Sequence, residues 1–155
     1  MAVPRWLSDD EQRAWRSFQH AHALLNRRIT DSLAEHAGLS EADYAVLVCL
    51  SEAPEGRIRA RDLGADLGWE KSRLSHHLTR MERRGLAERQ ECDTDARGAD
   101  VVLTPAGRAA IEAAAPQHVE DVRTWFVDAL SPAQLKALGA ACEAILTKLG
   151  ETRPV

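Results

Sequence analysis

Hydroxyl, imidazole and cationic side chains recur through residues 71–83 in a pattern that suits nucleic-acid binding. If this segment is a helix, with about 100° per residue, Leu78 and Met81 fall within about 40° of Leu74 and mark its buried side. The hydrogen-bonding side chains gather on the remaining surface: Lys71, Ser72, Arg73, Ser75, His76, Thr79, Arg80 and Arg83. Such groups suit base edges and phosphates, whereas a merely solvated helix more often alternates Glu with Lys. The pattern therefore favours nucleic-acid contact over an ordinary surface.

The distribution of charge supports this interpretation, although the chain of 155 residues has a formal net charge of −4. Residues 57–108 carry a net charge of +2, whereas the segments before and after them carry −4 and −2. Residues 57–89 hold nine basic and five acidic side chains, with His76 and His77 beside them. A cationic segment can follow phosphates even in an acidic protein, because counterion release depends on local charge.

The polar segment at residues 92–99 offers a second cationic contact. Arg97 lies next to Gly98, and an isolated cation at the tip of a glycine-containing loop can enter a narrow minor groove, where the potential is most negative. Asp95 would hold the loop in shape through an Asx turn or by pairing with a guanidinium. The alternative is an ordinary polar turn, which the loop residues taken alone favour.

The elements predicted around these residues are a helix, a tight turn, a second helix and a hairpin. Residues 61–67 make about two helical turns, and a longer helix spans residues 70–84; a glycine ends each of them. Short extended segments follow at residues 86–91 and 100–103. This order describes a winged helix-turn-helix, in which the second helix enters a major groove. The predicted fold class is therefore mainly α, with a small β-hairpin wing and a helical dimerisation region.

Further helices are predicted on both sides of this lobe, over residues 40–53, 105–129 and 132–149 and in a long first helix. Ser8 and Glu11 form a capping box at the start of that first helix. Its apolar stripe recurs at helical spacing: Trp15, Phe18, His22, Leu25, Ile29 and Leu33.

A chain of this length has too little core to cover the apolar stripes of its terminal helices. Pairing with a second copy is therefore expected, and packing within one chain is the alternative. A twofold dimer would present two reading helices about one DNA turn apart, roughly 34 Å, to an inverted repeat in double-stranded DNA.

Other classes of protein are disfavoured. The sequence has no Gly-rich phosphate loop, nucleophile elbow or His-Glu-x-x-His motif, so we predict no enzyme, no cofactor and no metal site. Cys49, Cys92 and Cys142 lie far apart without a Cys-x-x-Cys pair, which argues against a disulfide scaffold. We find neither an apolar run that could cross a bilayer nor a signal segment, so a cytoplasmic protein without a membrane partner is expected.

The chain resembles the multiple antibiotic resistance regulator (MarR) family over nearly its whole length. The resemblance is carried by residues 63–68, 72–89, 95–98 and 103–107. It implies a homodimeric transcriptional regulator, which we expect to be a repressor. The implied organisation is an N-terminal dimerisation helix at residues 1–39, a DNA-binding lobe at residues 40–104 and C-terminal dimerisation helices at residues 105–155.

The resemblance also implies roles for single residues. His76 matches a position that often contacts a base or a phosphate, and Arg97 matches the arginine of an Asp-x-Arg wing motif. Ala96 departs from the pattern, because many relatives carry a basic residue there.

Members of this family commonly bind a small aromatic or anionic effector between the dimerisation helices and the DNA-binding lobe, and such binding would release the DNA. The implied effector-binding residues are Trp15, Arg16, His20, His22, Arg27 and Tyr44. His22 lies on the apolar stripe, where a histidine is more often an interface residue than a ligand contact.

Three alternatives to effector control by this route stay open. One is a redox-responsive regulator that uses Cys92, and another is a winged helix that contacts only proteins. The third is a metal-responsive regulator in which His20, His22 and His118 converge. However, His20 and His22 project about 200° apart on a helix and cannot easily share an ion.

Overall fold

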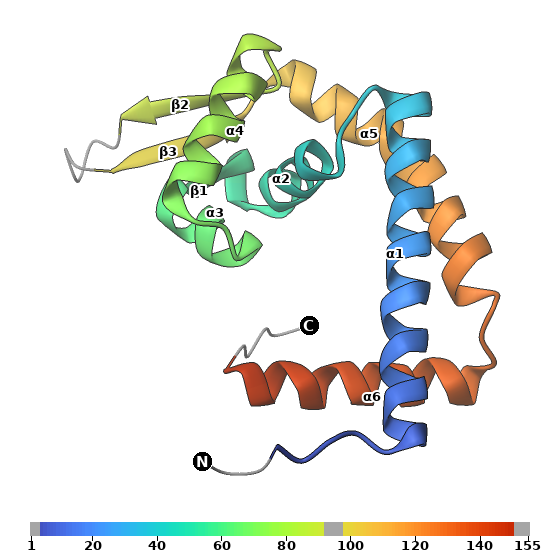
Figure 1. The fold of residues 1–155 in the computed structure, drawn as a ribbon. Coiled ribbons are helices and arrows are strands. Elements are labelled where there is room, and N and C mark those ends of the chain that lie inside the picture. The colour runs from blue at the N-terminus through green and yellow to red at the C-terminus, as the bar shows by residue number, and fades with distance from the viewer. Residues whose placement is uncertain (1–3, 92–97, 151–155) are drawn as a thin grey trace. The chain divides into compact units, whose positions relative to one another are not determined.

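The computed structural model describes residues 4–91 and 98–150, which are mainly helical with one small sheet (Figure 1). In chain order the elements are α1 (Asp9–Ala37), α2 (Glu41–Glu52), a 3-10 turn (Pro54–Gly56), β1 (Arg57–Arg59), α3 (Ala60–Leu67), α4 (Lys71–Arg83), β2 (Ala87–Glu91), β3 (Ala99–Leu103), α5 (Pro105–Val122), a π-helical turn (Arg123–Val127) and α6 (Pro132–Leu149). The predicted fold class is confirmed. The chain divides into two compact units, residues 1–118 and 119–155.

Capping side chains determine where three helices begin. The predicted capping box of α1 is present: the Ser8 hydroxyl accepts from the Glu11 N–H, and the Glu11 carboxylate accepts from the Ser8 N–H. Ser40 and Asp43 form the same reciprocal pair at the start of α2, and Ser131 caps α6. These pairs satisfy backbone donors that a helix leaves open at its N-terminus.

The helix-turn-helix consists of α3 and α4, joined by a turn that needs a glycine. Gly68 has φ 63°, in the left-handed region, and its N–H donates to the carbonyl oxygens at the end of α3. The next residue, Trp69, donates its N–H to the Gly64 carbonyl. At the far end of α4, Gly85 has φ 71° and turns the chain into β2.

The sheet has three antiparallel strands in the order β1-β3-β2, so β1 adds a strand to the predicted hairpin. Arg57 pairs with Val102 between β1 and β3, and Ala87 pairs with Leu103 between β2 and β3. The start of α5 packs closely on this sheet at Gly107, where an added Cβ would lie 1.9 Å from the Leu86 carbonyl oxygen. Only glycine permits that approach.

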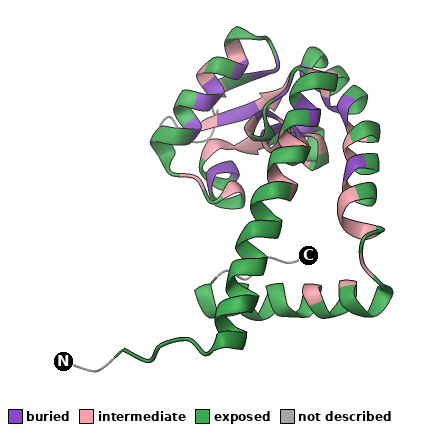
Figure 2. Cartoon of the chain, turned by 45° about the vertical axis from the view of Figure 1, so that its right-hand side comes forward, coloured by how far each residue is buried: buried purple, intermediate pink, exposed green. Residues whose placement is uncertain are grey.

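The main core lies inside the lobe formed by α2, α3, α4 and the sheet, where Figure 2 shows most of the buried segments. Its largest fully buried side chains come from all of these parts: Val46, Leu47, Leu50, Leu63, Leu78, Met81 and Val101. Leu74, Leu78 and Met81 are buried, as the helical spacing predicted. This core fixes which face of α4 points outward.

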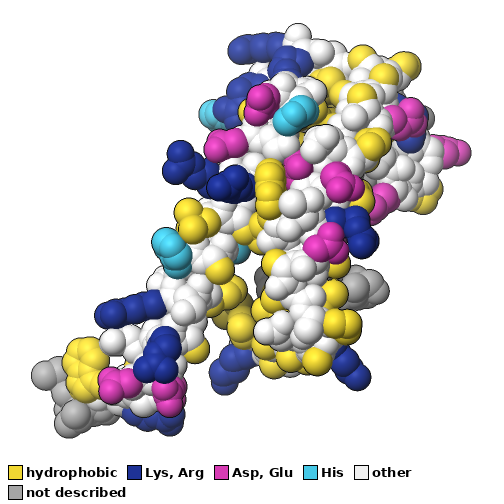
Figure 3. Space-filling view, turned by 90° about the vertical axis from the view of Figure 1, so that its right-hand side faces the viewer, with side chains coloured by type: hydrophobic (Ala, Val, Ile, Leu, Met, Phe, Trp, Pro, Cys, Tyr) yellow, Lys and Arg dark blue, Asp and Glu magenta, His cyan; other side chains and the backbone are white. Residues whose placement is uncertain are grey.

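The terminal helices leave large apolar side chains in solvent. On α1, Trp15 is 52% exposed and Phe18 is 48% exposed; on α6, Ile145 is 53% exposed and Leu149 is 70% exposed. Figure 3 shows such hydrophobic side chains on the surface of the molecule. Among the described residues, no helix combines the length and apolar character that crossing a bilayer requires.

One predicted helix ends earlier than expected. The segment predicted to run from residue 105 to about Ala129 is α-helical only to Val122, and residues 123–127 form a π-helical turn instead. Side-chain spacing alone did not distinguish this wider turn from a continued α-helix.

Candidate nucleic-acid interface

The surface of α4 divides into three strips that differ in their partners. We call Ser72, His76 and Arg83 the outer strip, because they lie about 160° to 200° around the helix from buried Leu74. All three are exposed. In the part of the chain that the structure describes, no hydrogen bond or ion pair engages the side chain of any of them, or that of Lys71 at the first turn. Their donors and acceptors are therefore available to a ligand.

The second strip faces the wing, and Arg89 of β2 covers it. We call Ser75, Thr79 and Glu82 the wing-facing strip. The Arg89 guanidinium donates to Ser75 Oγ at 3.3 Å, to Thr79 Oγ1 at 2.9 Å and to Glu82 Oε2 at 2.5 Å. The Arg89 N–H also donates to Glu82 Oε1 at 2.8 Å. Two predicted DNA contacts, Ser75 and Thr79, are thus already hydrogen-bonded within the protein.

The third strip contains Arg73, His77 and Arg80. The Arg73 guanidinium carbon lies 4.3 Å from the centroid of the Trp69 ring, a cation–π contact that fixes the side chain beside the turn. Arg80 Nη2 lies 3.0 Å from His77 Nδ1. Both arginines are exposed, so this strip presents two oriented cations beside the outer strip.

His77 belongs to the basic segment of the sequence but does not lie on the cationic surface of α4. It is only 5% exposed, and its Nε2 lies 3.1 Å from Asp43 Oδ1 without the alignment of a hydrogen bond. Burial lowers the pKa of His77 below its ordinary value, although the Asp43 carboxylate opposes that effect. With Nδ1 accepting from Arg80, the neutral ring carries its proton on Nε2, toward Asp43.

His77 also touches Trp69, whose ring meets the imidazole edge to face with centroids 5.4 Å apart. Its burial agrees with helical periodicity, because His77 lies only about 60° from Leu74 around the helix.

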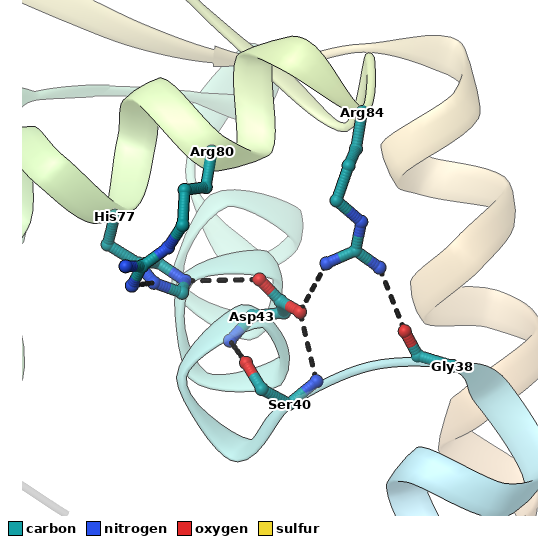
Figure 4. Close-up of polar contacts among 6 residues, drawn as sticks. All are labelled: Gly38, Ser40, Asp43, His77, Arg80 and Arg84. Atoms are coloured by element: carbon teal, nitrogen blue, oxygen red, sulfur yellow. Dashed lines mark hydrogen bonds and ion pairs between the residues drawn. The ribbon is translucent and has the colours of Figure 1, made fainter.

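Asp43 is the buried centre of a polar cluster that joins three helices (Figure 4). Its carboxylate accepts from Arg84 Nη1 at 2.6 Å and from the Ser40 N–H at 2.9 Å. Arg84 Nη2 donates to the Gly38 carbonyl at 2.8 Å, where α1 ends. Burial alone would raise the pKa of Asp43, but hydrogen bonds from Ser40 and Arg84 outweigh it and keep that pKa below its ordinary value.

This cluster anchors α4, because its members join the end of α1 and the start of α2 to the middle and C-terminus of α4. Neither Asp43 nor Arg84 was predicted to be part of the site, and Arg89 was not predicted either. No local pattern marks these partners, because they are far apart in the sequence. Asp43 and Arg84 are 41 residues apart, and Gly38 and Arg84 are 46 residues apart.

The predicted wing contact falls on residues that are not described. Asp95 and Arg97, together with Ala96 and Cys92, lie outside the described ranges. Gly98 is half-buried and directly precedes β3. The described residues on either side of this segment, Glu91 of β2 and Ala99 of β3, are paired with each other.

The predicted effector-binding residues lie at separate places in the structure. Trp15, Phe18 and His22 stack in series along α1, with centroids 6.1 Å and 6.0 Å apart. Arg16 and His20 are exposed on the same helix, and Arg27 pairs with Asp31.

Tyr44 packs instead on His118, with ring centroids 4.3 Å apart. The helix that carries Tyr44 contacts α1 through Glu41, which accepts from Asn26. Asn26 lies about 16 Å along α1 from Trp15, so Tyr44 and Trp15 lie at different places. Within residues 4–91 and 98–150, no three His, Cys, Asp or Glu side chains are grouped so as to hold a metal ion.

Comparisons with known proteins agree with this architecture. The family model for the MarR family matches residues 37–98. The structure of AbsC, a MarR family transcriptional regulator from Streptomyces coelicolor, is similar with 41% sequence identity and a TM-score of 0.91, over 94% of this chain and 98% of that one. No curated protein is similar enough to this chain to count as a match.

A second solved structure is of Sco3205, a MarR family transcriptional regulator from Streptomyces coelicolor in complex with DNA. It is 37% identical, with a TM-score of 0.91, over 95% of this chain and 92% of that one. The likeness therefore extends over the terminal helices as well as the lobe.

Proposed function

Because the chain belongs to the MarR family of transcriptional regulators, which are DNA-binding proteins and not enzymes, we propose that it represses transcription by inserting α4 into the major groove of an operator. The observation that carries this proposal is the outer strip, whose polar side chains are exposed and have no partner among the described residues. Sco3205, at 37% identity, was solved in complex with DNA, which supports the same role for this chain.

We assign the side chains of α4 to different parts of the DNA according to their chemistry. Ser72 and His76 are short and uncommitted, and we assign them to base edges in the groove. Lys71, Arg73 and Arg80 carry charge at the start and along one side of the helix, and we assign them to phosphates. Phosphate contacts set the position of the helix, and base contacts set the sequence preference.

The wing supplies a second contact in this proposal. Arg97 would enter the minor groove beside the major groove occupied by α4, and Asp95 and Gly98 would shape the loop that carries it. The anchoring of β2 to α4 through Arg89 supports a fixed spacing between the two contacts.

We propose a homodimer formed by residues 1–39 and 105–155, with residues 40–104 as the DNA-binding lobe. The exposed apolar side chains of α1 and α6 support it, since faces of this kind mark an interface. A twofold dimer requires an inverted-repeat operator whose half-sites lie roughly 34 Å apart.

We further propose that a small aromatic or anionic effector releases the DNA. The aromatic series of Trp15 and His22 and the cations Arg16 and Arg27 on α1 offer the contacts that such a molecule needs, and His20 and Tyr44 complete the proposed set. An effector that prefers a conformation unlike the DNA-bound one would lower DNA affinity, and DNA would lower effector affinity equally.

The test is to select bound sequences from a random-sequence duplex pool and to measure affinity for the selected duplex across salt concentrations. We expect an inverted repeat and an affinity that falls steeply with salt. His76→Ala should change the selected sequence, and Arg97→Ala should weaken binding to it. Absence of duplex binding even at low salt would overturn the proposal in favour of a winged helix that contacts proteins.

A further inference from the structure

Arg89 lies on strand β2 and forms hydrogen bonds to three residues of α4: Ser75, Thr79 and Glu82. Its side chain is 32% exposed and that of Glu82 is 28% exposed, so their ion pair lies at the surface, where such a pair contributes little to stability. Nevertheless Arg89 donates to Glu82 from Nε, from Nη2 and from its backbone N–H. The arrangement fixes the orientation of the guanidinium far more than it stabilises the fold.

The fixed guanidinium in turn fixes two hydroxyls. Thr79 Oγ1 accepts from Arg89 at 2.9 Å and donates to the Ser75 carbonyl at 3.0 Å, so its proton and its orientation are both committed. Ser75 Oγ accepts from Arg89 at 3.3 Å, which leaves the Ser75 proton to be donated elsewhere. A hydroxyl that accepts from a cation is also polarised as a donor.

We infer that Arg89 and Glu82 are positioning residues for DNA recognition, which hold Ser75 and Thr79 in one arrangement at the edge of the α4 surface that meets the wing. This inference rests on the proposed DNA-binding function and assigns determinants of sequence preference outside the outer strip. Arg89 acts through the two hydroxyls and through the spacing of β2 from α4. Direct pairing of Arg89 with a DNA phosphate is the competing explanation.

Two conservative substitutions separate these explanations. Arg89→Lys keeps the positive charge but loses the fork that reaches Ser75, Thr79 and Glu82 together. Glu82→Gln keeps the size of the side chain but removes the charge that orients the guanidinium. Glu88→Gln is the matched control, because Glu88 is an exposed carboxylate on the same strand that accepts a hydrogen bond from Gln90 and not from α4. Arg13→Lys on α1 serves as the arginine control.

The measurement is the ratio of affinities for the selected operator and for an unrelated duplex, at several salt concentrations. We expect Arg89→Lys and Glu82→Gln each to lower this ratio by about tenfold, with a wild-type salt slope and unfolding midpoint. The two control variants should keep the wild-type ratio. Adding Thr79→Val to Arg89→Lys should lower the ratio little further, because both changes disrupt the same arrangement.

Three outcomes would overturn the inference. The ratio would be unchanged in Arg89→Lys if the arginine only supplies charge to a phosphate. Glu82→Gln would raise affinity for both duplexes equally, as Glu88→Gln does, if the carboxylate only repels DNA. If the affinity ratio fell only together with the unfolding midpoint, the contacts of Arg89 and Glu82 would support the fold and not DNA recognition. If the wild-type protein bound no duplex at all, the proposed function itself would fail, which is a different result from specific binding that ignores Arg89 and Glu82.

Discussion

The two neighbouring histidines of α4 occupy opposite environments. His76 lies in the outer strip, exposed and without a hydrogen-bond partner among the described residues, whereas His77 is buried against Asp43, Arg80 and Trp69. One step of about 100° around the helix separates a group suited to bind DNA from one that holds the helix in place. A basic segment therefore forms a basic surface only where its residues do not fall on the buried side of the helix.

The difference extends to the groups around each histidine. The outer strip combines His76 with Ser72 and Arg83, all open to solvent. The polar cluster around Asp43 combines buried His77 with the half-exposed side chain of Arg84. Hydrogen bonds to Asp43 offset the cost of removing its carboxylate from water. Substitutions in the cluster should therefore change stability, and substitutions in the outer strip should change DNA binding.

The largest expected effect is on the stability of the fold in Asp43→Ala. This change removes the capping bond of α2 and leaves Arg84 and His77 without their carboxylate, so we expect a loss of about 3 kcal/mol in the free energy of unfolding. Urea denaturation followed by circular dichroism measures it.

Two further variants define how that loss arises. Asp43→Asn can keep the cap while losing the charge, so its loss should be smaller. Asp62→Ala removes an exposed carboxylate paired with Arg61 and should cost less than about 0.5 kcal/mol. An Asp43→Ala protein as stable as Asp62→Ala would show that the buried cluster does not support the fold.

The second prediction contrasts His77→Ala with His76→Ala. Truncating His77 opens a cavity between Trp69 and Asp43 and should cost about 2 kcal/mol of stability, whereas His76→Ala should leave the unfolding midpoint unchanged. Thermal and urea unfolding of both variants measure this directly. Equal losses of stability in the two variants would contradict the structure, in which His77 is buried and His76 is exposed.

The third prediction is the reverse effect on DNA. His76→Ala should weaken binding to the selected operator by about 1 to 2 kcal/mol and alter the preferred base at one position in each half-site, because a base-edge contact is lost. Competition with duplexes substituted at each position locates that base. A uniform weakening over all sequences would instead assign His76 to a phosphate.

Much of the fold could be predicted because the signals for it are local. The capping boxes at Ser8 and Ser40 and the glycine turns at Gly68 and Gly85 are each set by a few adjacent residues. The outer strip was also predictable, because helical periodicity alone places Ser72 and His76 opposite Leu74.

The rest of the site depends on contacts between distant segments. Arg84 reaches Asp43, and Arg89 folds back on Ser75 and Thr79, only once the sheet and α2 have packed on α4. No spacing in the sequence marks these pairs. The same tertiary contacts engage Thr79, a predicted DNA contact, in hydrogen bonds within the protein.

The smallest expected effect is the dependence of stability on pH that buried His77 introduces. The pKa of His77 is lowered by burial from its ordinary value of 6.5, so the unfolded chain binds a proton more readily than the folded protein does. Stability contributed by neutral His77 is therefore complete above that value and falls as the pH drops from 6.5 toward the lowered pKa. We expect a loss below about 1 kcal/mol between pH 7 and pH 5.5.

His77→Gln should flatten that part of the stability profile, because it removes the buried imidazole. A separate loss belongs to Asp43, whose lowered pKa means that its contribution disappears only below its ordinary value of 3.8. The loss from His77 begins as the pH falls below 6.5 and the loss from Asp43 begins only below 3.8, so urea unfolding across the pH range distinguishes the two onsets. An equal slope in His77→Gln and wild type would show that the buried imidazole is not the group that titrates.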